Sequence, residues 1–205
     1  MIRPTYIKFR RLQSLRPVLV RWIRLNKRSC KNFSWHDCAW WCGERTTTGV
    51  LAAAAWSLGG VALEEYVTPK SSGGKPRTGR CDIYIDVKEA KFVCEVKQLF
   101  ARFGRRDATD VSDVEEMLSS ACHDASNLPA SEGNRLGICF VTPSIPISDP
   151  ADIESRLEDW LARLRSLEWD AMGWCFPIQA RQLKWTNNRI FPGVVVLVRE
   201  VHRST

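Results

Sequence analysis

The spacing of apolar residues predicts four helices along the chain. Apolar positions recur at helical spacing over residues 12–25 and again over 40–57, where Gly59-Gly60 end the second helix. A third helix is predicted over 109–125, with Thr109 or Asp110 as its cap. The fourth is predicted over 149–167, with Asp149-Pro150 as cap and first turn.

Short apolar runs and period-two runs predict the strands. These lie at 61–68, 81–87, 92–98, 136–141 and 194–201, and the Gly-, Ser- and Pro-containing segment 69–79 is predicted to be a loop. From residue 40 onward the order is α, β, β, β, α, β, α, β. This alternation predicts an α/β fold with a mixed central sheet flanked by helices. The Val/Leu run at 194–201 is expected to be buried on both faces of that sheet.

The strands 81–87 and 92–98 are predicted to pair as a hairpin with a short turn. Setting Ile85 opposite Phe92 makes every pair on one face apolar, which supports that register. The predicted core face holds Cys81, Ile83, Ile85, Val87, Phe92, Cys94 and Val96. The same register places Asp82 opposite Glu95.

Asp82, Glu95 and Lys97 then share the polar face of this hairpin. Like charges opposite each other destabilise a sheet, so the two carboxylates need an ion or a shared proton between them. A hard divalent cation such as Mg²⁺ meets that need and retains waters, one of which can become a nucleophile. Lys97 can orient or deprotonate that water, or offset charge on a phosphate. The alternative is an exposed face of three ordinary charges on which Lys97 simply pairs with Glu95.

Asp82, followed thirteen positions later by Glu95-Val96-Lys97, resembles the D…E-x-K signature of the PD-(D/E)XK nuclease superfamily, which has the restriction-endonuclease-like fold. The predicted order of helix, three strands, helix and strand over about residues 40–141 is similar to the αβββαβ core of that family. The resemblance implies Asp82 and Glu95 as ligands of Mg²⁺ or Mn²⁺ and Lys97 as the catalytic lysine. Gln98 matches an E-x-K-Q variant of the motif, whereas Arg80-Cys81 stands where the family name expects Pro.

The resemblance also implies an acidic residue from the first core helix, for which Glu44 is the candidate. Glu44 begins a helical stripe whose later members, Leu51 and Ala55, are apolar and would face the sheet. The alternative for Glu44 is a capping role in the first turn of its helix. Glu64 and Glu65 are rivals, because strand alternation sends only one of them inward.

The charge is unevenly distributed. Residues 1–36 hold ten Lys/Arg and no Asp/Glu, whereas the rest of the chain has 20 basic and 23 acidic side chains. We therefore predict a basic, helical N-terminal arm at 1–36 and a nuclease-like domain at 37–205. The arm favours a polyanionic partner or a docking protein, and its other interpretation is a solvated helix or one that covers the protein's own core through Leu15, Leu19 and Trp22.

Nucleic-acid contacts are expected from the basic loop, the motif and the arm. The candidate residues are Lys70, Lys75, Arg77, Arg80, Gln98, Arg10 and Arg11. DNA is the expected substrate, with RNA as the alternative. The sequence does not decide the oligomeric state.

Other function classes find little support. Cys30, His36, Cys38 and Cys42 lack the paired C-x₂-C spacing of zinc sites, and the remaining cysteines suit small core residues. The chain has no P-loop, no G-x-S-x-G and no H-E-x-x-H motif. It also has no apolar run suited to a membrane, so a cytoplasmic protein is expected.

Together these features predict a metal-dependent deoxyribonuclease. The resemblance places such an enzyme in bacterial or phage defence, repair or mobile-element biology. The alternative is an inactive nuclease-like subunit that binds DNA or scaffolds a larger nucleoprotein complex.

Overall fold

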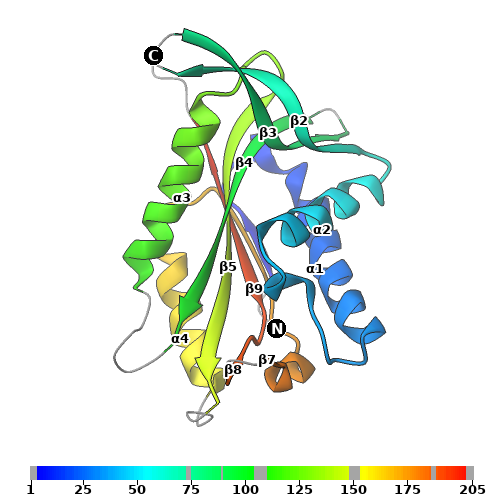
Figure 1. The fold of residues 1–205 in the computed structure, drawn as a ribbon, viewed down its shortest axis with the longest axis vertical. Coiled ribbons are helices and arrows are strands. Elements are labelled where there is room, and N and C mark those ends of the chain that lie inside the picture. The colour runs from blue at the N-terminus through cyan, green and yellow to red at the C-terminus, as the bar shows by residue number, and fades with distance from the viewer. Residues whose placement is uncertain are drawn as a thin grey trace.

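The protein is built around a mixed β-sheet, and helices pack on both faces of that sheet (Figure 1). The computed structural model describes residues 4–72, 75–88, 90–103, 110–147, 153–185 and 188–201. Seven strands lie in the order β1-β6-β9-β5-β4-β3-β2, and β7 and β8 attach beside β5. The bounds are β1 Thr5–Ile7, β2 Val61–Ser72, β3 Lys75–Val87, β4 Ala90–Arg102, β5 Asn134–Pro146, β6 Ala171–Cys175, β7 Lys184–Trp185, β8 Arg189–Ile190 and β9 Val194–Glu200.

Two helices cover each face of this sheet. In Figure 1 α1 and α2 lie to the right of the sheet, and α3 and α4 lie to its left. The bounds are α1 Leu15–Asn32, α2 Glu44–Trp56, α3 Val111–Ser126 and α4 Ile153–Arg165, with short 3₁₀ helices η1 Arg10–Leu12, η2 Ala39–Trp41 and η3 Ile178–Gln182. The predicted α/β class with a mixed, helix-flanked sheet is confirmed.

β9 illustrates why the sequences of the central strands are continuous apolar runs. Val194, Val196 and Val198 pack with α1 and α2, whereas Val195 and Leu197 pack with α3 and α4. Because both faces of the sheet are covered, both sets of side chains are buried, as the sequence predicted. β4 and β5 pair directly and run parallel, and the helix α3 connects them in the chain.

The predicted helices and strands are present, with shifted ends. Asp110 is the N-cap of α3 and forms a capping box with Asp113, whereas the predicted cap Asp149-Pro150 lies outside the described residues. The strands β1, β6, β7 and β8 were not predicted; β1, β7 and β8 have only two or three residues, whereas β6 is a non-polar run of five that the sequence analysis missed. None of the helices in the described part of the chain is long and apolar enough to cross a membrane.

The N-terminal segment is part of the fold, not an arm that extends from it. β1 pairs with β6 at the edge of the sheet. In α1, Leu15, Leu19 and Trp22 are buried in the same core cluster as Ile83 and Ile85 of β3. The amphipathic pattern therefore described a helix that covers the protein's own core, with its basic side chains turned to solvent.

In the segment predicted as a loop at 69–79, residues 69–72 and 75–79 belong to two paired strands instead, and 73–74 lie outside the described residues. β2 and β3 pair continuously from Thr68↔Gly79 to Ser72↔Lys75. Proline is tolerated at 69 and 76 because this part of the hairpin lies beyond the sheet's central pairings, where a missing ladder donor costs little. The hairpin extends at the top of Figure 1.

Candidate functional site

Strand β3 parts from β4 at Asp82. The paired register runs from Val87↔Ala90 to Ile83↔Cys94 and stops there, so the predicted register is confirmed up to Ile83, whereas the predicted pairing of Asp82 with Glu95 is not made. At the next position the Asp82 Oδ2 atom accepts a hydrogen bond of 2.7 Å from the backbone N–H of Val96. The Asp82 side chain thus takes the place of the β3 backbone as the hydrogen-bond partner of β4. Beyond Ile83 the two strands are no longer paired, and we call this opening, with Asp82 at its base, the fork.

A distortion in β2 lies opposite this fork. Glu65 has a positive φ of 54°, and the pairing of β2 with β3 skips from Glu64↔Ile83 to Tyr66↔Cys81. A left-handed backbone is unfavourable for a residue with a Cβ atom and is found where the surroundings enforce it. On β3 the face changes at the same level, because Cys81 packs with Val93 beneath α3 and not on the predicted face with Ile83.

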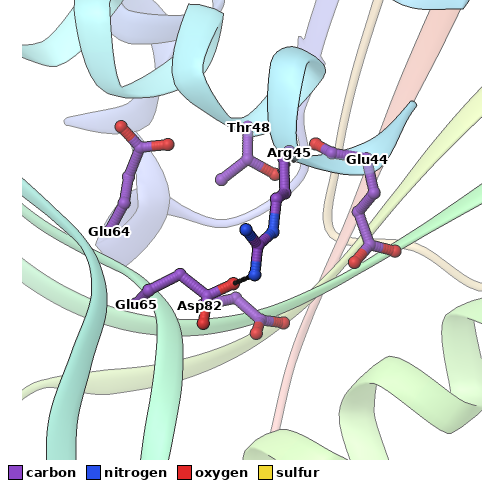
Figure 2. Close-up of a pocket in the computed structure, with 6 residues that line it drawn as sticks. All are labelled: Glu44, Arg45, Thr48, Glu64, Glu65 and Asp82. Atoms are coloured by element: carbon purple, nitrogen blue, oxygen red, sulfur yellow. Dashed lines mark hydrogen bonds and ion pairs between the residues drawn. The ribbon is translucent and has the colours of Figure 1, made fainter. Parts of the chain in front are cut away.

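Four carboxylates line one pocket between α2 and these strands. The lining residues are Glu44, Arg45, Thr48, Glu64, Glu65 and Asp82. Figure 2 shows Glu44 and Arg45 extending from α2, and Glu65 meeting the Arg45 guanidinium close to Asp82. The prediction that only one of Glu64 and Glu65 would turn inward was wrong, because the positive φ of Glu65 breaks the strand alternation.

Gln98 fixes the start of α2, and with it Glu44. The amide nitrogen of Gln98 donates to the Trp40 carbonyl at 2.8 Å and to Thr142 Oγ1 at 3.2 Å. Its amide oxygen accepts from Thr47 Oγ1 at 3.4 Å. These contacts hold η2 and the first turn of α2 against β4 and β5. The Gln98 side chain is therefore engaged inside the protein, and its expected contact with nucleic acid stays a prediction.

Glu95 lies farther along β4 and is bound by a lysine from the hairpin. The Lys70 Nζ atom is 2.7 Å from Glu95 Oε1, and the whole Glu95 residue is only 4% exposed. Lys70 was expected to face nucleic acid from a flexible loop. The structure places its ammonium inside the fork instead.

Lys97 is held by Asp124 of α3 at 2.8 Å. Residues near Asp124 pack tightly on the sheet, because a Cβ atom on Gly137 of β5 would lie 2.5 Å from the backbone nitrogen of Cys122. Glycine at 137 therefore lets α3 approach β5 closely enough for this contact. The alternative that Lys97 simply pairs with Glu95 is not observed.

The pKa values of Glu44, Asp82 and Glu95 are all raised, mainly by burial. Burial is the main cause of the raised pKa of Glu44, and the charge of Asp82 adds to it. Burial also raises the pKa of Asp82, although the Val96 N–H and the charges of Lys97 and Lys70 oppose that shift. Burial raises the pKa of Glu95 to about 6, with the Lys70 hydrogen bond opposing and the Asp82 charge assisting. Asp82 is thus within electrostatic reach of the other two carboxylates.

Burial and the neighbouring charges shift the pKa of Lys97 in opposite directions. Burial alone would lower the pKa of Lys97, but the hydrogen bond to Asp124 and the negative charges of Asp124, Asp82 and Glu44 raise it. Lys97 therefore stays an ammonium ion at neutral pH. A protonated lysine can stabilise negative charge and donate hydrogen bonds, but it cannot accept a proton.

The donor set of the fork suits a hard divalent cation held by few protein ligands. Within the described ranges, no group of three or more His, Cys, Asp or Glu side chains is arranged to hold a metal ion. Mg²⁺ is usually held by one or two carboxylates with waters and substrate phosphates completing its shell. Asp82 and Glu95 supply such a pair, with Glu44 beside Asp82, and Lys70 occupies one oxygen of Glu95.

The other predicted nucleic-acid residues fall into two groups. Lys75, Arg77 and Arg80 are exposed on β3 in the hairpin, and Arg80 lies 3.7 Å from Glu65 at the rim of the pocket. Arg10 and Arg11 lie on η1, where Arg11 pairs with Glu200 of β9. Of these residues the structure therefore places Arg80 near the fork, with Arg77 and Lys75 farther along the same strand.

Sequence reasoning missed Asp124 and the inward position of Lys70. Asp124 stands on the predicted helix with no spacing signal, since its contact with Lys97 depends on how α3 docks on β5. The cysteine cluster considered for zinc has buried Cys30 and Cys38 and an exposed Cys42.

Comparisons of the chain with protein-family models, with curated proteins and with solved structures found no match.

Proposed function

We propose that this protein is a metal-dependent nuclease that hydrolyses phosphodiester bonds in DNA. The observation that carries the proposal is the fork at Asp82. There an interrupted β3–β4 ladder brings a carboxylate from each strand, a third from the start of α2 and a lysine from β4 into one electrostatic unit. Carboxylates with raised pKa values beside a lysine, one of them the buried Glu95, are more typical of a functional site than of a structural one.

The arrangement of elements supports the finer assignment to a restriction-endonuclease-like core. The order α2, β2, β3, β4, α3, β5 combines antiparallel pairs β2–β3 and β3–β4 with the parallel pair β4–β5. Asp82 lies on the second of these strands and Glu95 and Lys97 on the third. This is the order that the resemblance to the PD-(D/E)XK superfamily implies.

Each residue of the site has a distinct role in the proposed reaction. Asp82 and Glu95 would hold the divalent cation, and Glu44 would assist through its position beside Asp82. The bound cation supplies positive charge against the phosphate and lowers the pKa of water. Lys97, kept protonated by Asp124, stabilises the negative charge that develops on the phosphate as the bond to the leaving oxygen breaks.

Cations near the fork would hold the nucleic-acid backbone. Arg45 and Arg80 flank Glu65 at the rim of the pocket, and both side chains are largely exposed. Lys75 and Arg77 continue this basic surface along the hairpin. Contacts of this kind position a phosphate backbone without reading its sequence.

Plasmid cleavage tests the proposal. Supercoiled DNA is incubated with Mg²⁺ or Mn²⁺ and wild-type protein, Lys97→Ala, Asp82→Asn or the matched control Lys91→Ala, an exposed lysine on the same strand as Lys97. We expect wild type and Lys91→Ala to cleave, and Lys97→Ala to lose at least about a hundredfold in rate, as loss of a transition-state contact does. Wild-type cleavage by Lys97→Ala, or no cleavage by any protein, would contradict the assignment.

The two ion pairs in the fork favour a second candidate function, an inactive nuclease-like subunit that binds DNA. Lys70 engages Glu95 and Asp124 engages Lys97, so both chemical groups already have partners. This alternative predicts DNA binding that does not depend on divalent metal, together with no cleavage by wild-type protein. The same plasmid assay, paired with binding measured in chelator, separates the two functions.

A further inference from the structure

The contact between Lys70 and Glu95 joins two strands that are not neighbours in the sheet. Lys70 belongs to β2 and Glu95 to β4, with β3 between them. The two side chains are only 13% and 6% exposed, and their atoms are 2.7 Å apart. A buried ion pair of this kind depends strongly on both partners, unlike a surface pair.

The hairpin is held in the position that delivers Lys70. Glu132, in the segment between α3 and β5, accepts hydrogen bonds from the Tyr66 hydroxyl and from Thr68 Oγ1, the latter at 2.8 Å. The backbone N–H of Ser71 donates to the Asn127 carbonyl at 2.9 Å. These contacts stand on both sides of Lys70 in β2, so its backbone is anchored against the end of α3.

Gly79 leaves room for the Lys70 side chain on the neighbouring strand. A Cβ atom at 79 would lie 2.7 Å from Cδ and 2.9 Å from Cγ of Lys70. Any other residue would therefore push the lysine stem aside. The anchored backbone and the open space at Gly79 are two independent features that direct one ammonium group to Glu95.

We propose that Lys70 gates the carboxylate site. Its ammonium holds Glu95 while the site is empty and moves to a backbone phosphate when nucleic acid enters, which releases Glu95 for a divalent cation. The inference rests on the proposed nuclease function and adds regulation to it. It makes Lys70 a competitor of the metal and a contact of the substrate.

The gate couples the two ligands. While Lys70 contacts Glu95, its positive charge repels a cation and occupies Oε1. A phosphate that draws Lys70 away removes both obstacles, so nucleic acid strengthens metal binding. By thermodynamic reciprocity, the metal strengthens nucleic-acid binding by the same factor. Such coupling limits metal occupancy to the substrate-bound protein.

Calorimetric titration of metal-free protein with Mn²⁺ tests the gate without any cleavage. We expect Lys70→Met to bind Mn²⁺ about tenfold tighter than wild type, within the usual range of coupling between sites. Gly79→Ala retains the lysine but displaces it, so it should tighten binding in the same direction. Lys91→Met, which removes an exposed lysine of β4, should match wild type.

A second titration adds a short DNA duplex in a Lys97→Ala background, which prevents cleavage. The duplex should tighten Mn²⁺ binding about tenfold more in Lys97→Ala than in Lys70→Met/Lys97→Ala, where only direct contact of the cation with phosphate couples the two ligands. Mn²⁺ affinity that is equal or weaker in folded Lys70→Met would overturn the gate while leaving the nuclease proposal standing. Absence of Mn²⁺ binding by wild type and by folded Lys70→Met, both with and without the duplex, would overturn both. If Lys70→Met does not fold, Gly79→Ala decides the question by the same criterion.

Discussion

At Glu95 burial and charge oppose each other. The residue is 4% exposed, and burial raises its pKa to about 6 even though Lys70 donates a hydrogen bond to it. An ionised carboxylate in such surroundings destabilises the fold and suits a site that accepts a cation. Glu65, with its left-handed backbone, and Asp82, which replaces a ladder partner, are two further departures from regular structure at the same place.

The pKa of Glu95 predicts a pH-dependent stability. Because the folded-state pKa lies above the ordinary value of 4.5, Glu95 contributes stability that is complete below about pH 4.5 and is lost as the pH rises through about 6. Glu95→Gln is neutral at every pH. We therefore expect the free energy of unfolding of wild type, relative to Glu95→Gln, to fall across this window.

Urea unfolding in chelator at a series of pH values measures this difference. Glu158→Gln, which removes an exposed carboxylate from α4, is the matched control. A difference between wild type and Glu95→Gln that stays constant over the window would show that the carboxyl group does not titrate there.

At the scale of elements, α1 is the clearest case of a pattern with two interpretations. Its apolar stripe and basic face are equally compatible with a free amphipathic arm and with a helix packed on the protein's own sheet. Trp22 is fully buried and stacks near Phe140 of β5, at 5.8 Å between ring centroids. β1 adds backbone pairing with β6 on the N-terminal side of α1.

Deletion of residues 1–31 should therefore abolish folding and not merely weaken DNA binding. The deletion exposes the core residues that α1 covers on β5 and β9, and loss of one buried tryptophan alone costs about 3–5 kcal/mol. We expect aggregation, or loss of the cooperative thermal transition in circular dichroism. A soluble, cooperatively folded deletion variant would mean that α1 is dispensable to the core.

At the scale of the whole molecule, the packed α1 presents a band of cations to solvent. Arg24, Lys27, Arg28 and Lys31 are all exposed, and the chain before residue 37 has no acidic side chain to neutralise them. Their spacing of three and four residues places them on one face of the helix. Such a face suits a polyanion such as a nucleic-acid backbone.

Charge substitution on this face tests the polyanion contact without disturbing the core. Each lysine or arginine that contacts a phosphate contributes about 0.9 to the slope of log affinity against log salt concentration. Arg24→Gln/Arg28→Gln should flatten that slope by about two on duplex DNA, measured by fluorescence anisotropy. Lys88→Gln/Lys91→Gln removes the same charge from the β3–β4 turn. Equal slopes for the two double variants would indicate that net charge, and not α1, determines binding.

The sequence alone determined the features that depend on local pattern and on pairs of neighbouring strands. The α/β class, the course of α2 and α3, the capping role of Asp110 and the Ile83↔Cys94 register all follow from periodicity and from keeping apolar faces together. These features need no knowledge of how distant segments meet. The D…E-x-K spacing could therefore be placed on two paired strands, and Glu44 on the helix before them.

Only the tertiary structure decided the contacts that make the site specific. A polar, Gly- and Pro-containing segment became part of a hairpin because Glu132 and Asn127, some sixty residues away, hold it. That docking turned Lys70 onto Glu95, and the close approach of α3 at Gly137 brought Asp124 to Lys97. Such contacts join segments far apart in the chain, and local spacing carries no information about them. The docking of whole elements on one another determines which charges meet.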